Sequence, residues 1–312
     1  MQTSDLIPPA VFAVGETVLD IIFRDGQVQA ARAGGSMLNS AVSLGRCGIH
    51  VSLISETGQD QTGNMIKTFL ENNGVQTRYL HQYNEMKTAL AMAFLDERSD
   101  ASYDFYKNYP AQRLSGPLPR FEPNTLLLFG SWFGIDPALR SRLQHIMEAA
   151  RKAGSILYYD PNFRRPHLKQ LPLVKPFILE NMAAAHIIRA SHEDLELIFG
   201  ISTLEEWEVL PQVRGKVLIL TRAAGTAELR HGPVHIQLPA QPVQVVSTIG
   251  AGDNFNAGII YGLLQQQCQL NTMENFSPEQ WKEILRLGLA FAAASVQSYD
   301  NWVPEGFTPA TG

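Results

Sequence analysis

Cysteines and charged residues are both scarce in this 312-residue sequence. It has two cysteines, Cys47 and Cys268, and 18% of its residues are charged. Two cysteines do not make a disulfide framework, so we expect a reducing, cytoplasmic location. The chain has 25 basic and 30 acidic residues, which gives a net charge of −5. Nucleic acids and anionic membranes attract proteins with a basic surplus, so we expect neither as a partner.

Long apolar runs are also missing. The longest, at 126–135 and 287–296, are shorter than the roughly 18 residues that cross a bilayer. The first 15 residues have neither a basic segment nor an apolar stretch of the signal-peptide type. Hydrophobic residues nevertheless make up 45% of the chain, which is enough for a packed core. We therefore expect a soluble globular protein.

Short apolar runs alternate with helical patterns along most of the chain. This alternation predicts an α/β fold, a three-layer α/β/α body with a mostly parallel central sheet. We expect strands at 11–14, 18–23, 51–54, 126–129, 156–159, 186–189 and 217–220. We expect helices at 37–47, 62–72, 137–152 and 192–199.

One region departs from this alternation. Residues 78–83, 89–96 and 102–107 look like consecutive strands with no helix between them. They predict a small antiparallel sheet, which is either a lid over a site or an edge extension of the main sheet. No repeat or long linker interrupts the chain. We therefore expect one domain over 1–312, with lid strands within about 18–32 and 78–108.

The most informative segment is 243–258, VQVVSTIGAGDNFNAG. An apolar strand is expected to lead into a tight turn at Gly250, Ala251 and Gly252, followed by a helix that starts near Asp253. The backbone N–H groups of this turn, together with the helix N-terminus, predict an anion site. Glycine is needed there because a Cβ atom blocks the close approach of a phosphate.

Asp253 has two interpretations. As an ordinary N-cap it needs no function, and its position alone favours this interpretation. As a general base it would take the proton of a hydroxyl that attacks a phosphoryl group bound by the turn. Other phosphate motifs fail, because no Walker glycine precedes Lys67-Thr68 and Phe255 stands at the third glycine of a dinucleotide fingerprint.

Three polar or flexible positions near the N-terminus are compatible with sugar binding. Asp20 ends an apolar stretch, and Gly34 and Gly35 precede Asn39 by a few residues. The carboxylate accepts hydrogen bonds from hydroxyls, the glycines let the backbone approach a ligand, and the amide both donates and accepts. Taken singly, they are equally explained as a surface carboxylate, a plain turn and a solvent-facing amide.

Together these motifs resemble the ribokinase-like, or PfkB, family of carbohydrate kinases over nearly the whole chain. The matching positions are Asp20; Gly34, Gly35, Asn39 and Ala41; Gly58, Asp60 and Gly63; Gly130 and Ser131; the D-P-N-x-R run from Asp160 to Arg164; and G-A-G-D-x-F-x-A-G at 250–258. Within the family, the stretches 103–111, 128–132 and 191–197 look most like fructokinases.

The resemblance implies an ATP-dependent sugar kinase, with fructose as the first expected substrate. It implies that Asp253 is the base and that the N–H groups of Gly250, Ala251 and Gly252 stabilise the transferred phosphoryl group. The sugar-binding residues that it implies are Asp20, Gly34, Gly35, Asn39, Lys107 and Arg164. The nucleotide-binding residues that it implies are Ser191, Thr221, Gly225, Gly250, Gly252, Ala292 and Ser295. Magnesium is expected on the ATP phosphates, with Asp194 or Glu193 in the outer coordination sphere, and a homodimer is expected to form through the lid.

The sequence departs from the family pattern at several positions. Ser247 stands where many members have an Asp that serves a monovalent-cation site, which argues against potassium activation. Asp194 replaces the usual Glu three residues after Ser191, and Ala223 replaces the first glycine of the nucleotide loop. Lys107 stands where fructokinases often have Arg, and lysine lacks the bidentate fork.

Substrate alternatives remain open. Lys107 is one cation near the expected sugar site, with Arg113 the next along the chain, whereas a sugar phosphate is usually bound by a cluster or a bidentate Arg. We therefore expect a neutral sugar. The alternatives are a 2-keto-3-deoxygluconate kinase, another sugar or nucleoside kinase, or a non-catalytic sugar or nucleotide sensor. The sensor is disfavoured because a pure binder gains nothing from Asp253 beside a phosphate.

Two further features are expected to be structural. His231 and His235 have a metal-like spacing, but a Gly-Pro turn separates them and no third ligand is evident in the sequence. We expect two surface histidines. Trp132, beside Gly130-Ser131, is expected to pack rather than to catalyse.

Overall fold

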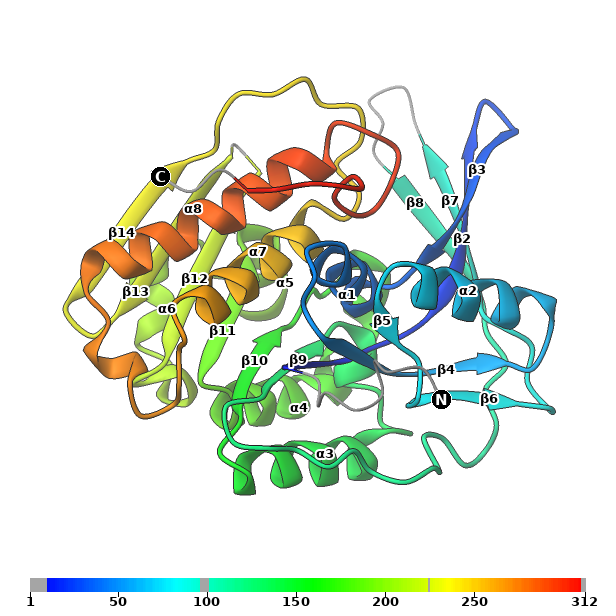
Figure 1. The fold of residues 1–312 in the computed structure, drawn as a ribbon, viewed down its shortest axis with the longest axis horizontal. Coiled ribbons are helices and arrows are strands. Elements are labelled where there is room, and N and C mark those ends of the chain that lie inside the picture. Colours follow the sequence, from blue (N-terminus) through cyan, green and yellow to red (C-terminus); the bar gives the residue numbers. More distant parts are fainter. Residues whose placement is uncertain (1–9, 96–100, 224, 310–312) are drawn as a thin grey trace.

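The computed structural model describes residues 10–95, 101–223 and 225–309. Within this part of the chain, a ten-stranded sheet forms the centre of the molecule, in the order β14-β13-β12-β11-β10-β9-β1-β4-β5 with β6 paired to β4 (Figure 1). Its strands are β1 (Val11–Val14), β4 (Val51–Gly58), β5 (Val75–Gln76), β6 (Leu80–Tyr83), β9 (Leu126–Gly130), β10 (Ile156–Asp160), β11 (Ile187–Ser191), β12 (Val217–Arg222), β13 (Thr226–His231) and β14 (Val234–Pro239). The pairs from β5 to β12 are parallel, whereas β13 and β14 are antiparallel.

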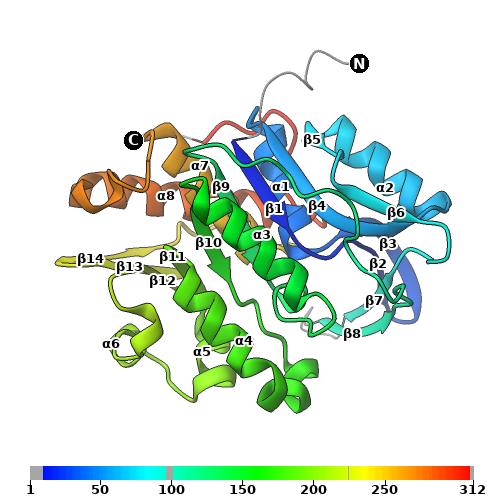
Figure 2. The same cartoon turned by 90° about the horizontal axis from the view of Figure 1, so that it is seen from below.

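Helices cover both faces of this sheet (Figure 2). One layer holds α1 (Ser36–Arg46), α2 (Gln61–Asn72), α7 (Ala251–Gln265) and α8 (Pro278–Ser295). The other layer holds α3 (Arg140–Lys152), α4 (Leu171–Ala184), α5 (His192–Phe199) and α6 (Leu204–Glu208). Central strands are apolar at every position because both of their faces are buried. In β1, Val11 and Ala13 pack against the first helix layer, and Phe12 and Val14 pack against the second. The predicted α/β/α body is confirmed.

A separate four-stranded sheet, which we call the small sheet, stands off one end of the body (Figure 1). Its order is β3-β2-β7-β8, with β2 (Val18–Arg24), β3 (Gln27–Gly34), β7 (Leu90–Leu95) and β8 (Ala101–Tyr106). It is mixed rather than antiparallel, because β2 and β7 are parallel. The last residue of the expected strand 89–96 lies outside the described residues.

The prediction that 78–83 belongs to the small sheet is wrong. This stretch forms β6, which pairs in parallel with β4 from Ser55 to Gly58. The physical reason is the length of β4, since β5 covers only Val51 and Ser52 and leaves the outer half of that edge to β6. Strands β2 and β3 supply the remaining half of the small sheet.

The strand predicted at 243–246 is also wrong. This stretch is irregular and passes the end of α8, where the N–H groups of Val246 and Ser247 donate to Val296 O over 2.8 and 3.2 Å. Helix α7 begins at Ala251, two residues earlier than expected, because Gly250 is its N-cap with φ of 78°. An added Cβ at Gly250 would lie 2.8 Å from the carbonyl oxygen of Asn301, so only glycine fits there.

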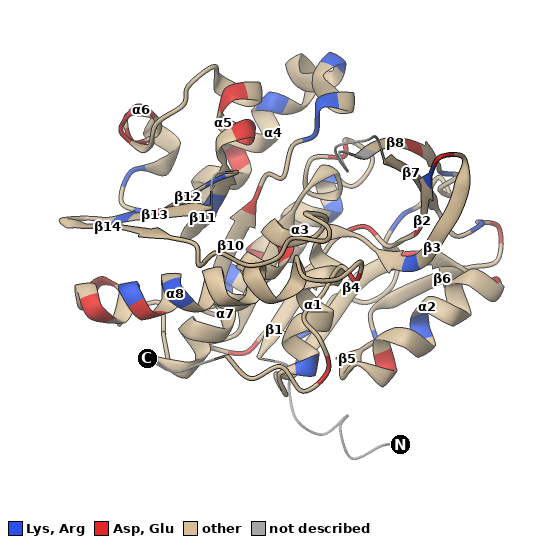
Figure 3. Ribbon diagram, turned by 90° about the horizontal axis from the view of Figure 1, so that it is seen from above, with Lys and Arg blue, Asp and Glu red and all other residues tan. Residues whose placement is uncertain are grey.

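Charges of both signs are interspersed along the ribbon, and α8 carries both (Figure 3). Among the described residues, no helix combines the length and the apolar character that crossing a bilayer requires.

Candidate active site

Asp253 lies where α1 packs against α7, and α1 supplies its hydrogen-bond donors. Ser36 Oγ donates to Asp253 Oδ1 over 2.5 Å, and Asn39 Nδ2 donates to Oδ2 over 2.8 Å. Ser40 Oγ donates to the backbone carbonyl of Asp253 over 2.7 Å. These donors recur three and four residues apart, so they share one face of α1. The carboxylate is therefore held by a second helix.

The N-cap interpretation of Asp253 is wrong, because Gly250 is the N-cap and no side chain caps this helix. Asp253 is 7% exposed, and burial raises the pKa of its carboxyl group. The hydrogen bonds from Ser36 and Asn39 and the positive charge of Arg164 oppose that shift. A buried carboxyl group with a raised pKa and fixed geometry has the properties of a general base.

The glycine turn presents the start of α7 beside this carboxyl group. The first N–H groups of a helix have no acceptor within it, and Asn254 N is the first to donate to Gly250 O, over 2.9 Å. The N–H of Ala251 donates to Thr248 O over 3.3 Å, so this member of the predicted set already has a long bond within the protein. An anion could be bound at this helix start.

Asp20 and the glycine pair lie next to each other, as expected. A Cβ on Gly34 would be 2.0 Å from Asp20 Oδ2, and one on Gly35 would be 2.0 Å from the carbonyl oxygen of Glu16. Gly35 also has φ of 128°, a conformation that other residues rarely adopt. Asn301 Nδ2 donates to Asp20 Oδ2 over 3.2 Å. Glycine is thus required at position 35, and a side chain at position 34 would displace the Asp20 carboxylate.

Asp20 has an unusual protonation equilibrium. Burial, together with the negative charges of Asp253 and Glu16, raises its pKa to about 7, against the opposing bond from Asn301. Three acidic groups therefore gather at this place, and Asp20 changes its charge near neutral pH.

Lys107 does not face the site as an isolated cation. Its Nζ contacts Glu16 Oε1 and Oε2 at 2.7 and 2.9 Å, and Tyr109 donates to the same carboxylate over 2.5 Å. Arg113 is buried with Glu56 and Asp136, at 2.8 and 2.5 Å. Both cations are therefore neutralised by carboxylates.

Arg164 is the exposed cation of the predicted set. Its charge lowers the pKa of Asp253 and that of Tyr103, which lies on β8 of the small sheet. Among the described residues no carboxylate lies within ion-pair distance of it, and Glu193 pairs with the neighbouring Arg165 instead. Its exposed guanidinium therefore acts both on the carboxyl group of α7 and on the small sheet.

The residues predicted to bind nucleotide lie in four places, one of which is the start of α7 with Gly250 and Gly252. Ser191 caps α5, and Thr221, the last residue but one of β12, accepts a 2.5 Å bond from Arg189 Nη2. Gly225 lies in the turn before β13 with φ of 76°. On α8, Ser295 is buried and donates to the carbonyl oxygen of Ala292 over 2.9 Å. The Ser295 hydroxyl is thus engaged within its own helix.

The two carboxylates predicted to assist magnesium are engaged elsewhere. Asp194 accepts bonds from the N–H groups of Ser191 and Phe163 over 2.7 and 2.6 Å, and it completes a capping box. Glu193 forms a surface ion pair with Arg165 at 3.1 Å. Both oxygens of Asp194 are thus engaged, whereas Glu193 is half-exposed beside its pair, and the outer-sphere role of the two residues stays a prediction.

Sequence reasoning missed several residues of this region. Glu16, which joins Lys107 and Tyr109, lies two residues after a buried strand. Ser36 lies one helical turn before Asn39, so helical spacing could have indicated it. Arg189 is a charged residue near the end of an otherwise apolar strand, which is a usable signal of a buried ion pair.

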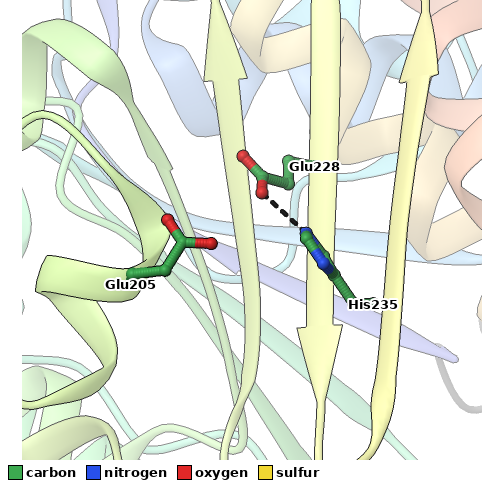
Figure 4. Close-up of side chains that lie close together, drawn as sticks. All are labelled: Glu205, Glu228 and His235. Atoms are coloured by element: carbon green, nitrogen blue, oxygen red, sulfur yellow. Dashed lines mark hydrogen bonds and ion pairs between the residues drawn. The ribbon is translucent and has the colours of Figure 1, made fainter.

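The two histidines do not form one site. In the pairing of β13 with β14, His235 lies opposite Arg230 and therefore on the same face of the sheet as Arg230. His231 is the next residue after Arg230 and points to the other face. The centres of the His231 and Trp281 rings lie 5.5 Å apart, whereas His235 lies close to Glu228 and Glu205 (Figure 4). Together these last three could hold a metal ion.

The positive charge of Arg230 already neutralises part of that acidic cluster. Arg230 contacts Glu205 at 3.3 Å and Glu208 at 3.2 Å, and it lies 3.3 Å from His235 Nδ1. A cation would have to displace this guanidinium, so we assign no metal role to the cluster.

The three-layer body, the small sheet and a buried carboxyl group beside a helix start are the features expected of an enzyme that transfers a phosphoryl group. The chain belongs to the pfkB family of carbohydrate kinases, whose pattern matches residues 10–301. Probable fructokinase-2 of Arabidopsis thaliana is 26% identical over 298 residues, which cover 91% of this chain and 88% of that protein. The resemblance drawn from the motifs is confirmed.

Solved structures share the fold. Aminoimidazole riboside kinase from Salmonella enterica, complexed with aminoimidazole riboside and an ATP analogue, superposes with a TM-score of 0.79 at 22% identity, over 93% of this chain and 94% of that one. A double mutant of the Vibrio cholerae O395 fructokinase, bound to fructose, ADP and potassium ion, superposes with a TM-score of 0.78 at 20% identity, over 93% of each chain.

Proposed function

We propose that this chain is an ATP-dependent kinase of a neutral sugar, with fructose as the first substrate. The observation that carries the proposal is the position of Asp253, a buried carboxyl group held by Ser36 and Asn39 at the first turn of α7. The fructokinase relatives and the fructose- and ATP-analogue-bound structural neighbours support the choice of substrates.

In this proposal Asp253 takes the proton of the attacking hydroxyl. The hydroxyl oxygen then bonds to the γ-phosphorus of ATP as the bond to the β,γ-bridging oxygen breaks, which releases ADP. The N–H groups of Gly250, Ala251 and Gly252 stabilise the charge on the transferred group. Asp20, Asn39 and the backbone at the Gly34-Gly35 pair orient the sugar.

Magnesium enters this proposal only as part of the nucleotide substrate. Bound to the phosphates, it neutralises charge there and supplies Lewis-acid chemistry. Because Asp194 and Glu193 are already engaged, we assign no residue of this chain to it as a direct ligand.

A neutral substrate is favoured by the charges around the sugar site. Glu16, Asp20 and Asp253 bring carboxyl groups together, and Lys107 is paired with Glu16. A phosphate ester carries close to two negative charges and would meet these groups with Arg164 as the exposed cation. A neutral sugar avoids this repulsion.

We further propose that the small sheet is a lid and a dimer surface. In the small sheet, Ala91 pairs with Asp20 on one neighbouring strand and with Phe105 on the other, so these three side chains share the face toward the site. Phe94 pairs with Phe23, and both lie on the opposite face. Those two rings stack at 5.0 Å, and Phe94 is 37% exposed. A second copy would cover this aromatic face. Light scattering of the wild type and of Phe94→Asp tests the dimer.

The test of function is ATP turnover on a panel of acceptors, with the product mapped by phosphorus NMR. The panel comprises fructose, glucose, ribose, 2-keto-3-deoxygluconate, fructose 1-phosphate, fructose 6-phosphate and aminoimidazole riboside. The highest kcat/KM is expected for fructose. A higher value for a phosphate ester or an acidic sugar would overturn the neutral-sugar assignment, and no turnover on any acceptor would favour the sensor.

A further inference from the structure

A buried charged network lies at the carboxyl ends of three neighbouring parallel strands. Arg189 on β11 is 6% exposed and donates from Nη1 to Asp160 Oδ2 on β10 over 3.0 Å. Its Nη2 donates to Thr221 Oγ1 on β12 over 2.5 Å. Asn256 Nδ2, from α7, donates to the same Asp160 oxygen over 2.6 Å. One guanidinium thus connects the ends of β10 and β12 beneath α7.

The same guanidinium lies against the glycine turn. A Cβ on Gly252 would be 2.9 Å from Arg189 Nη1 and 3.0 Å from Nη2, so the first turn of α7 rests directly on it. The guanidinium carbon is also 5.8 Å from the centre of the Phe255 ring on that helix. A side chain at position 252 would therefore push the Arg189 guanidinium away from the turn.

Arg189 keeps its charge although it is buried. Burial disfavours the charged form, but the negative charges of Asp160 and Asp194 outweigh it and raise the pKa of Arg189. Its Nε is buried and has no hydrogen-bond partner in the described part of the chain. A buried ion pair with an unpartnered donor adds little to stability, which suggests another use for it.

We propose that Arg189 is a positioning residue for the nucleotide phosphates, an inference that rests on the proposed function. It holds the first turn of α7 on the strand ends and orders the Thr221 hydroxyl. It also places a permanent positive charge directly beneath the Gly250–Gly252 turn. Ligands of parallel α/β sheets bind at this carboxyl edge, and the helix start already favours an anion there. Arg189 shares its charge with Asp160 and lies directly against this helix start.

The experiment compares Arg189→Met, Arg189→Lys and a matched control, Arg140→Met. Arg140 is 8% exposed, donates to Asn181 Oδ1 over 2.6 Å and also has a buried Nε without a partner, but it lies on α3 in the opposite helix layer. ADP binding is measured by calorimetry, and kcat and both KM values are measured with fructose and ATP. Thermal unfolding of each variant is recorded alongside.

In Arg189→Met we expect ADP binding to weaken and kcat to fall, each by about tenfold or more, because the Thr221 hydroxyl loses its hydrogen bond and the buried Asp160 carboxylate loses its ion pair. The KM for fructose should stay within about twofold, since Asp20, Gly34 and Asn39 do not contact Arg189. Arg189→Lys keeps the charge without the fork, and it should recover part of the loss in ADP affinity. Arg140→Met should leave ADP binding unchanged.

Unchanged ADP affinity in Arg189→Met, with an active wild type, would overturn the role of Arg189 alone. A wild type that neither binds ADP nor phosphorylates any acceptor would overturn the proposed function, and this inference with it. If Arg189→Met does not fold, Thr221→Val provides the second test, because it removes the acceptor of Nη2 and keeps the charge. It should weaken ADP binding without a change in the fructose KM, and an unchanged ADP affinity would count against the proposal.

Discussion

Asn39 donates a 2.8 Å hydrogen bond to the Asp253 carboxylate, although 214 positions separate the two residues along the chain. The bond joins the glycine-rich motif near the N-terminus to the one near the C-terminus. Because Asn39 also lies beside the Gly34-Gly35 pair, the geometry of the sugar site and that of the base are set by one helix, α1. Each substitution below tests one part of that arrangement.

Asp253→Asn should lower kcat by about 10²–10⁴, the usual contribution of a general base. ATP affinity should stay the same or improve, because a negative charge beside the phosphates is removed. Steady-state kinetics and ADP calorimetry check both expectations. Asn254→Asp is not a suitable control, because the Asn254 amide donates to Gly250 O and Asn301 O. A variant that retains more than about a tenth of wild-type kcat would exclude Asp253 as the base.

Asn39→Ala should move the acid limb of the kcat profile to higher pH. The Asn39 amide stabilises the charged form of Asp253, so its loss lets burial raise the pKa of that carboxyl group further. A shift of about one pH unit corresponds to ~1.4 kcal/mol, the scale of one such hydrogen bond. The comparison variant is Ser43→Ala, which lies one turn further along α1 and contacts Asn254 instead. Identical pH profiles for wild type and Asn39→Ala would contradict the expectation.

Titration of Asp20 should make sugar binding depend on pH near neutrality. Its pKa is about 7 in the folded protein and 3.8 in a free chain, so folding favours the protonated form. The stability from this group is present below pH 3.8 and is lost as pH rises through about 7. The sugar KM should fall over the same rise, because the carboxylate is the stronger acceptor for a hydroxyl. Asp20→Asn should flatten both profiles, which thermal unfolding and fructose KM at several pH values would reveal.

Activation by potassium should be weak or absent. The Ser247 hydroxyl accepts a 3.2 Å bond from the Ile249 N–H and brings no negative charge to the place where many family members have Asp. Assays in sodium, potassium and tetramethylammonium chloride check this, with Ser247→Asp as the variant that should gain activation. A large potassium-specific increase in the kcat of the wild type would show that other groups supply the cation site.

The central strands could be predicted because they are buried on both faces. Strands such as β9 and β12 are continuous apolar runs, a pattern that parallel sheets between two helix layers require. The bounds of β3 could not be found in this way, although lid strands were expected within about 18–32, since half of its residues are exposed and its sheet partners include β7 far along the chain, through β2. Helix α4 was missed because Pro172 and Pro176 lie within it, and proline ordinarily disfavours a helix interior.

The site was predictable where a motif imposes local geometry, and not where partners come from distant segments. Gly250 could be recognised from its turn, and its positive φ agrees with that expectation. The pairing of Lys107 with Glu16 spans 91 positions and involves a carboxylate that no spacing rule connects to it. Such contacts depend on how the small sheet meets the body, which sequence periodicity does not describe.

Lys107→Ala should raise the fructose KM by less than about tenfold, which is below the ~1.5–3 kcal/mol of a charged hydrogen bond to substrate. The reason is indirect, because Lys107 neutralises Glu16, whose charge already raises the pKa of Asp20. Without Lys107, Glu16 keeps the hydrogen bond from the Tyr109 hydroxyl, and the repulsion between Glu16 and Asp20 should hold Asp20 in the protonated form, which is the weaker hydrogen-bond acceptor.

Glu16→Gln removes that repulsion, so the double variant Lys107→Ala/Glu16→Gln should bind fructose better than Lys107→Ala alone. A double-mutant cycle on fructose KM, at pH values on either side of about 7, measures this coupling. If the two effects simply add at every pH, Lys107 acts on the sugar directly and not through Glu16.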